Sequence, residues 1–189
     1  MVLTVLIGDE RHYGETQDDA DRLISKVMEI LQSGRNAWLS IDGHRRDRDG
    51  HSDNHLVVSL NRETGYGGIV WFVSEKYPKR GGIYESVWVS DNTTPPAIDP
   101  KVISDLSHPV FMEPASVFPL PDVRKILEEF YRTGTGDRPT CINWVKGHMN
   151  GERVERKSDA NPAEDSFTGA EALLDDLMKL IESGDIPRD

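Results

Sequence analysis

The chain has 189 residues, and its 22 Lys and Arg against 33 Asp and Glu give a formal net charge of −11. A chain of this length favours one domain, or one domain with an appendage, and can bury a core without disulfides. The acidity argues against nucleic acid as the main ligand, because phosphate contacts need clustered Lys and Arg, but it permits a basic partner. The single Cys141 excludes an intramolecular disulfide and any zinc site built from several thiolates.

Apolar residues dominate positions 1–7, but no basic segment precedes them and Gly8, Asp9 and Glu10 follow at once. This stretch predicts a first strand and not a signal peptide. The sequence nowhere approaches 18 consecutive apolar residues, so we expect no membrane-spanning helix. Together these features predict a cytoplasmic protein with no membrane partner.

Three helices are predicted from apolar residues that recur at intervals of three and four. The first covers residues 18–33, with Thr16 and Asp19 in the spacing of a capping box at its start. The second covers residues 120–133 and follows a proline-rich entry. The third covers residues 168–183 and has a leucine-rich apolar side.

Between the first two helices the pattern changes to alternation with β-branched and aromatic residues, which is typical of strands. A tight turn is predicted at residues 61–65, a longer basic loop at residues 74–82, and a last strand at residues 140–145. This order predicts an α+β fold, with a mostly antiparallel β-sheet packed by two helices, plus a C-terminal helix. The other predicted strands cover residues 37–42, 55–60, 67–73 and 83–90.

The predicted domain organisation is an α+β domain over residues 1–146, followed by a polar linker and an amphipathic helix over residues 147–189. Residues 147–165 carry charges of both signs and few apolar side chains, so they bury too little surface to offset the entropy of ordering. The third helix has an apolar stripe, and we therefore expect it to dock on its own sheet or on a partner.

The loop between the strands at residues 37–42 and 55–60 is the densest polar cluster of the chain. Its His and Asp side chains match the spacing of no standard metal site, and the Asp-x-Asp-Gly fragment lacks the bidentate Glu that closes a calcium loop. Three arginines in the same loop would repel a cation. We therefore expect no metal and no cofactor there, and a solvated loop that can contact a partner.

The sequence offers no clear catalytic set. There is no phosphate-binding glycine loop, and six scattered His residues do not identify a catalytic triad. Cys141 falls inside the strand predicted at residues 140–145, where a small buried side chain is the expected role. We predict no catalytic residue, although a small hydrolase with an acid/base pair on the sheet and a non-catalytic adaptor domain both stay open.

The four tryptophans all fall in predicted strands, where large rings usually fill the space between sheet and helix. The alternative is that one or two of them face outward as anchors of an interface, a role in which tryptophan is enriched. They are Trp38, Trp71, Trp88 and Trp144.

The stretch from Trp88 to Trp144 resembles immunity family one of the bacterial polymorphic-toxin systems. The shared features are a glycine-rich hairpin leading to an aromatic strand, a proline-started helix with Phe near its end, a Thr-Gly step and an Arg-Pro strand closing in Trp. The resemblance covers about residues 1–146. We interpret the family residues mainly as fold residues, namely Pro119, Phe130, Gly134, Pro139 and Trp144.

The resemblance implies a cytoplasmic protein, encoded beside a secreted toxin, that binds the C-terminal domain of that toxin and protects the producer. The toxins associated with the family are often nucleic-acid deaminases, whose substrate grooves are basic, so an acidic binder would meet them with complementary potential. We predict that loops carry the toxin-facing surface, because loops are free to differ between specificities. The candidates are Asp47, Asp49 and Asp53 in the first long loop, Trp88 as aromatic anchor, and Asp91 and Asp99 after the Trp88 strand.

Overall fold

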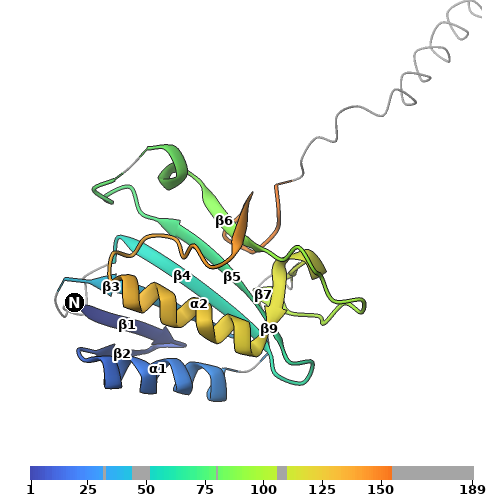
Figure 1. Ribbon diagram of the computed structural model, residues 1–189, viewed down its shortest axis with the longest axis horizontal. Helices are drawn as coiled ribbons and strands as arrows, with labels where there is room; N and C mark the ends of the chain where they lie inside the picture. Colours follow the sequence, from blue (N-terminus) through green and yellow to red (C-terminus); the bar gives the residue numbers. More distant parts are fainter. Residues whose placement is uncertain (32, 44–51, 80, 106–109, 155–189) are drawn as a thin grey trace, which may run out of the picture. The chain divides into compact units, whose positions relative to one another are not determined.

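A computed structural model of the chain describes residues 1–31, 33–43, 52–79, 81–105 and 110–154 (Figure 1). The chain divides into Met1–Val154 and Glu155–Asp189, and all the described residues lie in the first unit. The helix predicted at residues 168–183, most of the predicted linker, Asp47 and Asp49 lie outside the described residues. No helix in the described ranges is long and apolar enough to cross a membrane.

The main sheet is antiparallel and its strands follow the order β10-β6-β5-β4-β3-β1-β2, with β9 paired to the first residues of β5. The bounds are β1 Val2–Ile7, β2 Glu10–Gly14, β3 Asn36–Asp42, β4 Asn54–Asn61, β5 Tyr66–Val73, β6 Val87–Asp91, β9 Val117–Pro119 and β10 Asn143–Gly147. Two shorter strands, β7 (Ile103–Asp105) and β8 (Val110–Phe111), form a separate pair. With two helices on this sheet, the α+β prediction is confirmed.

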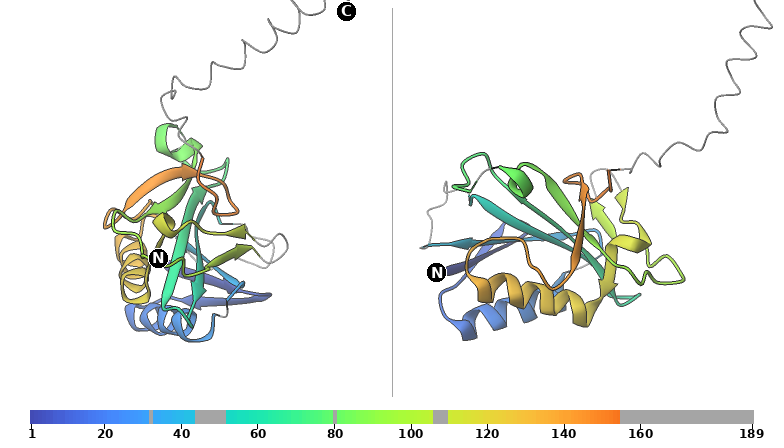
Figure 2. Two further views of the ribbon diagram at one scale, coloured as in Figure 1. Left: turned by 90° about the vertical axis from the view of Figure 1, so that its right-hand side faces the viewer. Right: turned by 45° about the horizontal axis from the view of Figure 1, so that its top comes forward.

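Helices α1 (Gln17–Ile30) and α2 (Leu120–Thr133) pack against each other and lie on one side of the sheet (Figure 2). The predicted capping box starts α1, where the Asp19 amide donates to Thr16 Oγ1 at 3.2 Å and the Thr16 amide donates to Asp19 Oδ2 at 3.3 Å. Helix α2 has the predicted bounds and ends at Gly134, whose φ of 66° suits a residue without Cβ. Helix α1 ends earlier than predicted, at Ile30.

Each face of the sheet has its own core. The helix side is mainly aliphatic and includes Leu39, Ile24 and Phe130, all fully buried. On the opposite face, Val57 and Val70 pack with side chains from the segment that carries β7 and β8; this second cluster also contains Val89, Val102, Met112 and Val117.

Two strands begin later than predicted, and in both cases the local backbone explains the delay. A 3₁₀ turn over Gly82–Glu85 replaces the start of the strand predicted at residues 83–90, and both Gly81 before the turn and Gly82 at its start have positive φ. Before β10, the carboxylate of Glu129 on α2 accepts the backbone N–H groups of Thr140 and Cys141 at 2.7 and 3.1 Å. These amides are therefore bound to the helix and do not pair with the sheet.

The first residues of the predicted linker are ordered. The Val154 amide donates to the Lys146 carbonyl at 2.9 Å, so the chain turns back along β10. Arg153 then pairs with the carboxylate of Asp91 on β6. These contacts hold residues 147–154 against the edge of the main sheet.

Candidate partner-binding surface

One part of the helix side of the sheet is covered by loops. Helices α1 and α2 cover this side from β1 and β2 to β5. Beyond them, the loop of residues 74–79 and 81–86 meets the loop of residues 134–142, because Tyr77 and Tyr84 of the first donate to Asp137 of the second. The second loop passes across β5 on its way from α2 to β10 (Figure 1). We name this region the loop-covered surface; its side chains are Tyr77, Lys79, Tyr84, Trp88, Asp137, Arg138 and Trp144.

Asp137 joins the two loops. Its Oδ1 accepts the hydroxyls of Tyr77 and Tyr84 at 2.8 and 2.9 Å, and its Oδ2 accepts Lys79 Nζ at 2.7 Å. Burial alone would raise the pKa of Asp137, but these hydrogen bonds outweigh it and hold the pKa below its ordinary value. Burial and the neighbouring Asp137 raise the pKa of Tyr77, which therefore stays a hydrogen-bond donor at neutral pH.

Arg138 lies between two tryptophans. Its guanidinium carbon is 4.1 Å from the ring centroid of Trp88 and 5.9 Å from that of Trp144. Each indole N–H is held by a carbonyl, that of Trp88 by Ile83 at 2.7 Å and that of Trp144 by Pro139 at 2.8 Å. Both rings are half-buried and fixed, so they set the position of the guanidinium.

A pocket of about 360 Å³ adjoins this surface at the end of the sheet. Tyr77 and Lys79 form part of its wall, together with Asp53, the residue before β4. The side-chain amide of Asn54 donates to Asp53 Oδ1 at 2.8 Å. Gly43, the last described residue before Asp47 and Asp49 in the chain, lines the same pocket.

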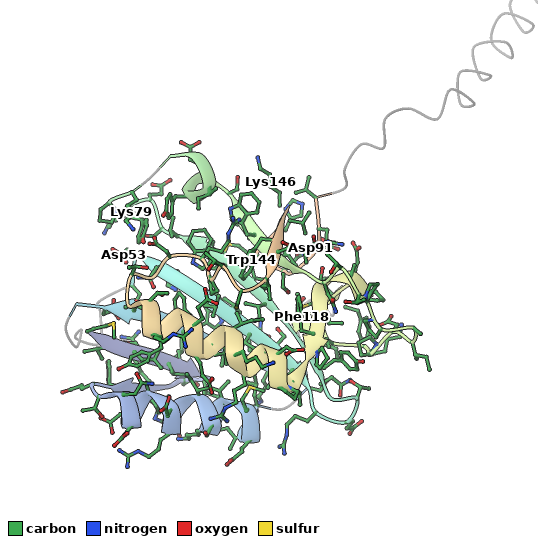
Figure 3. All side chains as sticks on the ribbon, in the orientation of Figure 1. Asp53, Lys79, Asp91, Phe118, Trp144 and Lys146 are labelled. Carbon is green, nitrogen blue, oxygen red and sulfur yellow. The ribbon has the colours of Figure 1, made fainter. Side chains whose placement is uncertain are left out.

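The structure does not gather the predicted site residues into one patch. Asp53 adjoins the loop-covered surface and Trp88 belongs to it, whereas Asp91 lies at the other end of the sheet, with Trp144 between (Figure 3). Asp91 pairs with Arg153. Asp99 accepts Lys101 Nζ at 2.8 Å, and the hydrogen bonds from Lys101 lower the pKa of Asp99.

Sequence reasoning missed five members of the surface as candidates, namely Tyr77, Lys79, Tyr84, Asp137 and Arg138. Arg138 was visible only as part of the Arg-Pro step of the family resemblance. Trp144 was interpreted as a fold residue, and it packs on the helix-side core while its ring also contacts Arg138.

The prediction that Cys141 is a small buried side chain inside a strand is wrong. Cys141 is exposed and precedes β10, because Glu129 binds the local backbone. Partial desolvation of the thiol and the adjacent Glu129 carboxylate raise the pKa of Cys141 to about 12. Such a thiol carries very little thiolate at neutral pH and is a poor nucleophile.

The tryptophans differ in burial. Trp71 is fully buried and donates its indole N–H to the Gly136 carbonyl at 3.1 Å. Trp38 is half-buried on the face opposite the helices, edge-on to His55 and Phe72 at 5.7 Å each. Among the described residues, no group of three His, Cys, Asp or Glu side chains is placed to hold a metal ion.

A family model described as immunity protein Imm1 matches residues 8–146. The comparisons with curated proteins and with solved structures gave no match. The matched range contains both described helices and the whole loop-covered surface.

Proposed function

The chain belongs to the Imm1 family of immunity proteins, and from this premise we propose that it binds and neutralises the C-terminal toxin domain of a cognate polymorphic toxin. The family match over residues 8–146 is the observation that carries the proposal. The protein acts by occupying the active-site region of the toxin, in the cytoplasm of the producing cell, and needs no catalysis of its own.

The proposed toxin is a nucleic-acid deaminase with a basic substrate groove. A net charge of −11 supports this choice of partner, since complementary potentials accelerate encounter and disfavour wrong partners. An acidic protein can fill such a groove without being a substrate.

The loop-covered surface is the proposed centre of the interface. Half-buried aromatic rings and an arginine that are already fixed before binding lose little side-chain entropy when a partner arrives. Asp47, Asp49 and Asp53 are its proposed acidic rim, because Asp53 adjoins the surface in the described pocket. Asp91 and Asp99 complete the proposed set, with smaller contributions, since each already has a cationic partner in its own chain.

Co-expression with the toxin domain encoded beside it tests the function. We expect the chain to restore growth and to co-purify with that domain, and to do neither with toxin domains of distant systems. Absence of both rescue and binding would refute the immunity function for that toxin. If the toxin domain binds the chain but by itself deaminates no cytosine or adenine in nucleic acids, the deaminase assignment is wrong and the immunity function stands.

A further inference from the structure

Arg138 is a half-buried cation with no counter-charge among the described residues. Its Nη1 is shielded from solvent and has no hydrogen-bond partner, and burial lowers the pKa of the guanidinium. Nε and Nη2 are not shielded in this way, and within the described part of the chain Arg138 forms no hydrogen bond and no ion pair. Its partners are the rings of Trp88 and Trp144.

This arrangement is costly for the protein by itself. A desolvated charge destabilises a fold unless it is paired, and cation–π contacts return only part of that cost. Carboxylates are abundant in this chain, yet the nearest one in sequence, Asp137, is committed to Lys79 and two tyrosines. The arginine is therefore held in position while its hydrogen-bonding edge stays unused.

We propose that this edge of Arg138 receives the carboxylate of an Asp or Glu side chain on the toxin domain. The inference rests on the proposed function and names one contact within it. Nε and Nη2 form the side of the guanidinium that takes a carboxylate through two parallel hydrogen bonds. The two tryptophans hold the guanidinium in place, so the pair forms with little loss of rotamer entropy.

An acidic partner group at this one point also gives specificity. The general field of the protein attracts any basic domain, whereas a bound domain without an acid at this position would cover Arg138 and leave it unpaired. A cognate toxin must therefore present both a basic groove and one carboxylate at the position that faces Arg138. That combination separates a cognate toxin from other basic domains better than net charge does.

Binding kinetics of the full chain against the catalytically inactivated toxin domain test the contact. Arg138→Met should dissociate about 30-fold faster or more, since removing one partner of a desolvated charge pair acts mainly on the off-rate. Arg138→Lys should recover only part of this loss, because an ammonium lacks the two-pronged edge. The matched control Arg132→Met, at an exposed arginine near the end of α2, should bind like the unmodified chain.

A scan of the toxin's surface Asp and Glu to Asn and Gln identifies the partner group. One toxin variant should weaken binding as much as Arg138→Met does and add nothing further in combination with it. Unchanged off-rates for Arg138→Met, or coupling of Arg138 to no toxin carboxylate, would overturn the inference and leave the immunity function standing. If Arg138→Met does not fold, Arg138→Lys is combined with the same toxin variants, and its coupling to one toxin carboxylate tests the contact. No binding by the unmodified chain would overturn the proposed function, and this contact with it.

Discussion

One face of the sheet is covered in two ways, by helices over one part and by loops over the other. Under α1 and α2 the side chains are mainly aliphatic and fully buried, with Leu39 and Phe130 among them. Beyond the helices the cover consists of loops, fixed by the Asp137 hydrogen bonds and by Arg138 between two indoles. The first construction stabilises through buried apolar area, and the second fixes polar and aromatic groups at a surface a partner can reach.

The largest effect is expected in the helix-covered part. Phe130→Ala should lower the free energy of unfolding by about 3–5 kcal/mol, because Phe130 is fully buried and its removal leaves a cavity. Phe111→Ala is the control, since that ring is 46% exposed and should cost well under half as much. Chemical denaturation of both variants measures the difference, and equal losses would contradict the assignment of the core.

Trp88→Ala tests both roles of one ring, because Trp88 packs against the helix-side core and belongs to the proposed binding surface. We expect a loss of about 2 kcal/mol in unfolding free energy, less than for a fully buried tryptophan, and faster dissociation from the toxin. Trp38→Ala is the matched control, since Trp38 is also half-buried but lies on the opposite face. It should cost similar stability and leave the off-rate unchanged. Faster dissociation of the Trp38 variant alone would place the interface on the other face.

Asp137→Asn should loosen the loop-covered surface and remove a pH dependence. We expect a loss of about 1–2 kcal/mol at pH 7, where the charged carboxylate binds Lys79 and two tyrosines. The folded-state pKa of Asp137 is lowered, so its contribution to stability is complete well above the ordinary value of 3.8 and is lost as the pH falls through that value toward the folded-state pKa. Denaturation at pH 7, 4 and 2.5 should therefore show a shrinking gap between the two chains. A gap independent of pH would contradict this role.

The smallest expected effect on the fold comes from reversing the charges of the proposed rim. Asp47→Lys combined with Asp49→Lys should lower the association rate and reduce its salt dependence, with an unchanged thermal midpoint. The double variant Asp9→Lys with Glu63→Lys changes the net charge equally at two exposed positions elsewhere. Stopped-flow binding against salt compares the two. Equal rates for both double variants would remove this loop from the interface.

The sequence predicted the helix-covered part well because its signals are local. The capping box at Thr16 marks the start of α1. The prolines before α2 and Gly134 after it mark both ends of that helix. The strand at β2 was missed because its sequence Glu10–Gly14 is mostly polar, and it forms only by pairing with β1. The late start of β10 depends on Glu129, which reaches the backbone from another element and has no local signature.

The candidate surface was harder to predict for a similar reason. Trp88 was a candidate through its residue type, but the partners that define its role come from a loop about 50 residues further along the chain. Composition favoured acidic residues as the interface of an acidic protein. It gave no reason to single out Arg138, whose lack of a counter-charge is a property of the folded structure.

Hydrogen exchange of the full chain, with and without the inactivated toxin domain, locates the toxin-binding surface on the fold. If the loop-covered surface is the toxin-binding site, amides in residues 74–86 and 134–142 should exchange more slowly in the complex, while those of α1 and β2 should be unchanged. Added protection confined to α1 and β2, with none in the two loops, would show that the toxin binds elsewhere and not at the loop-covered surface.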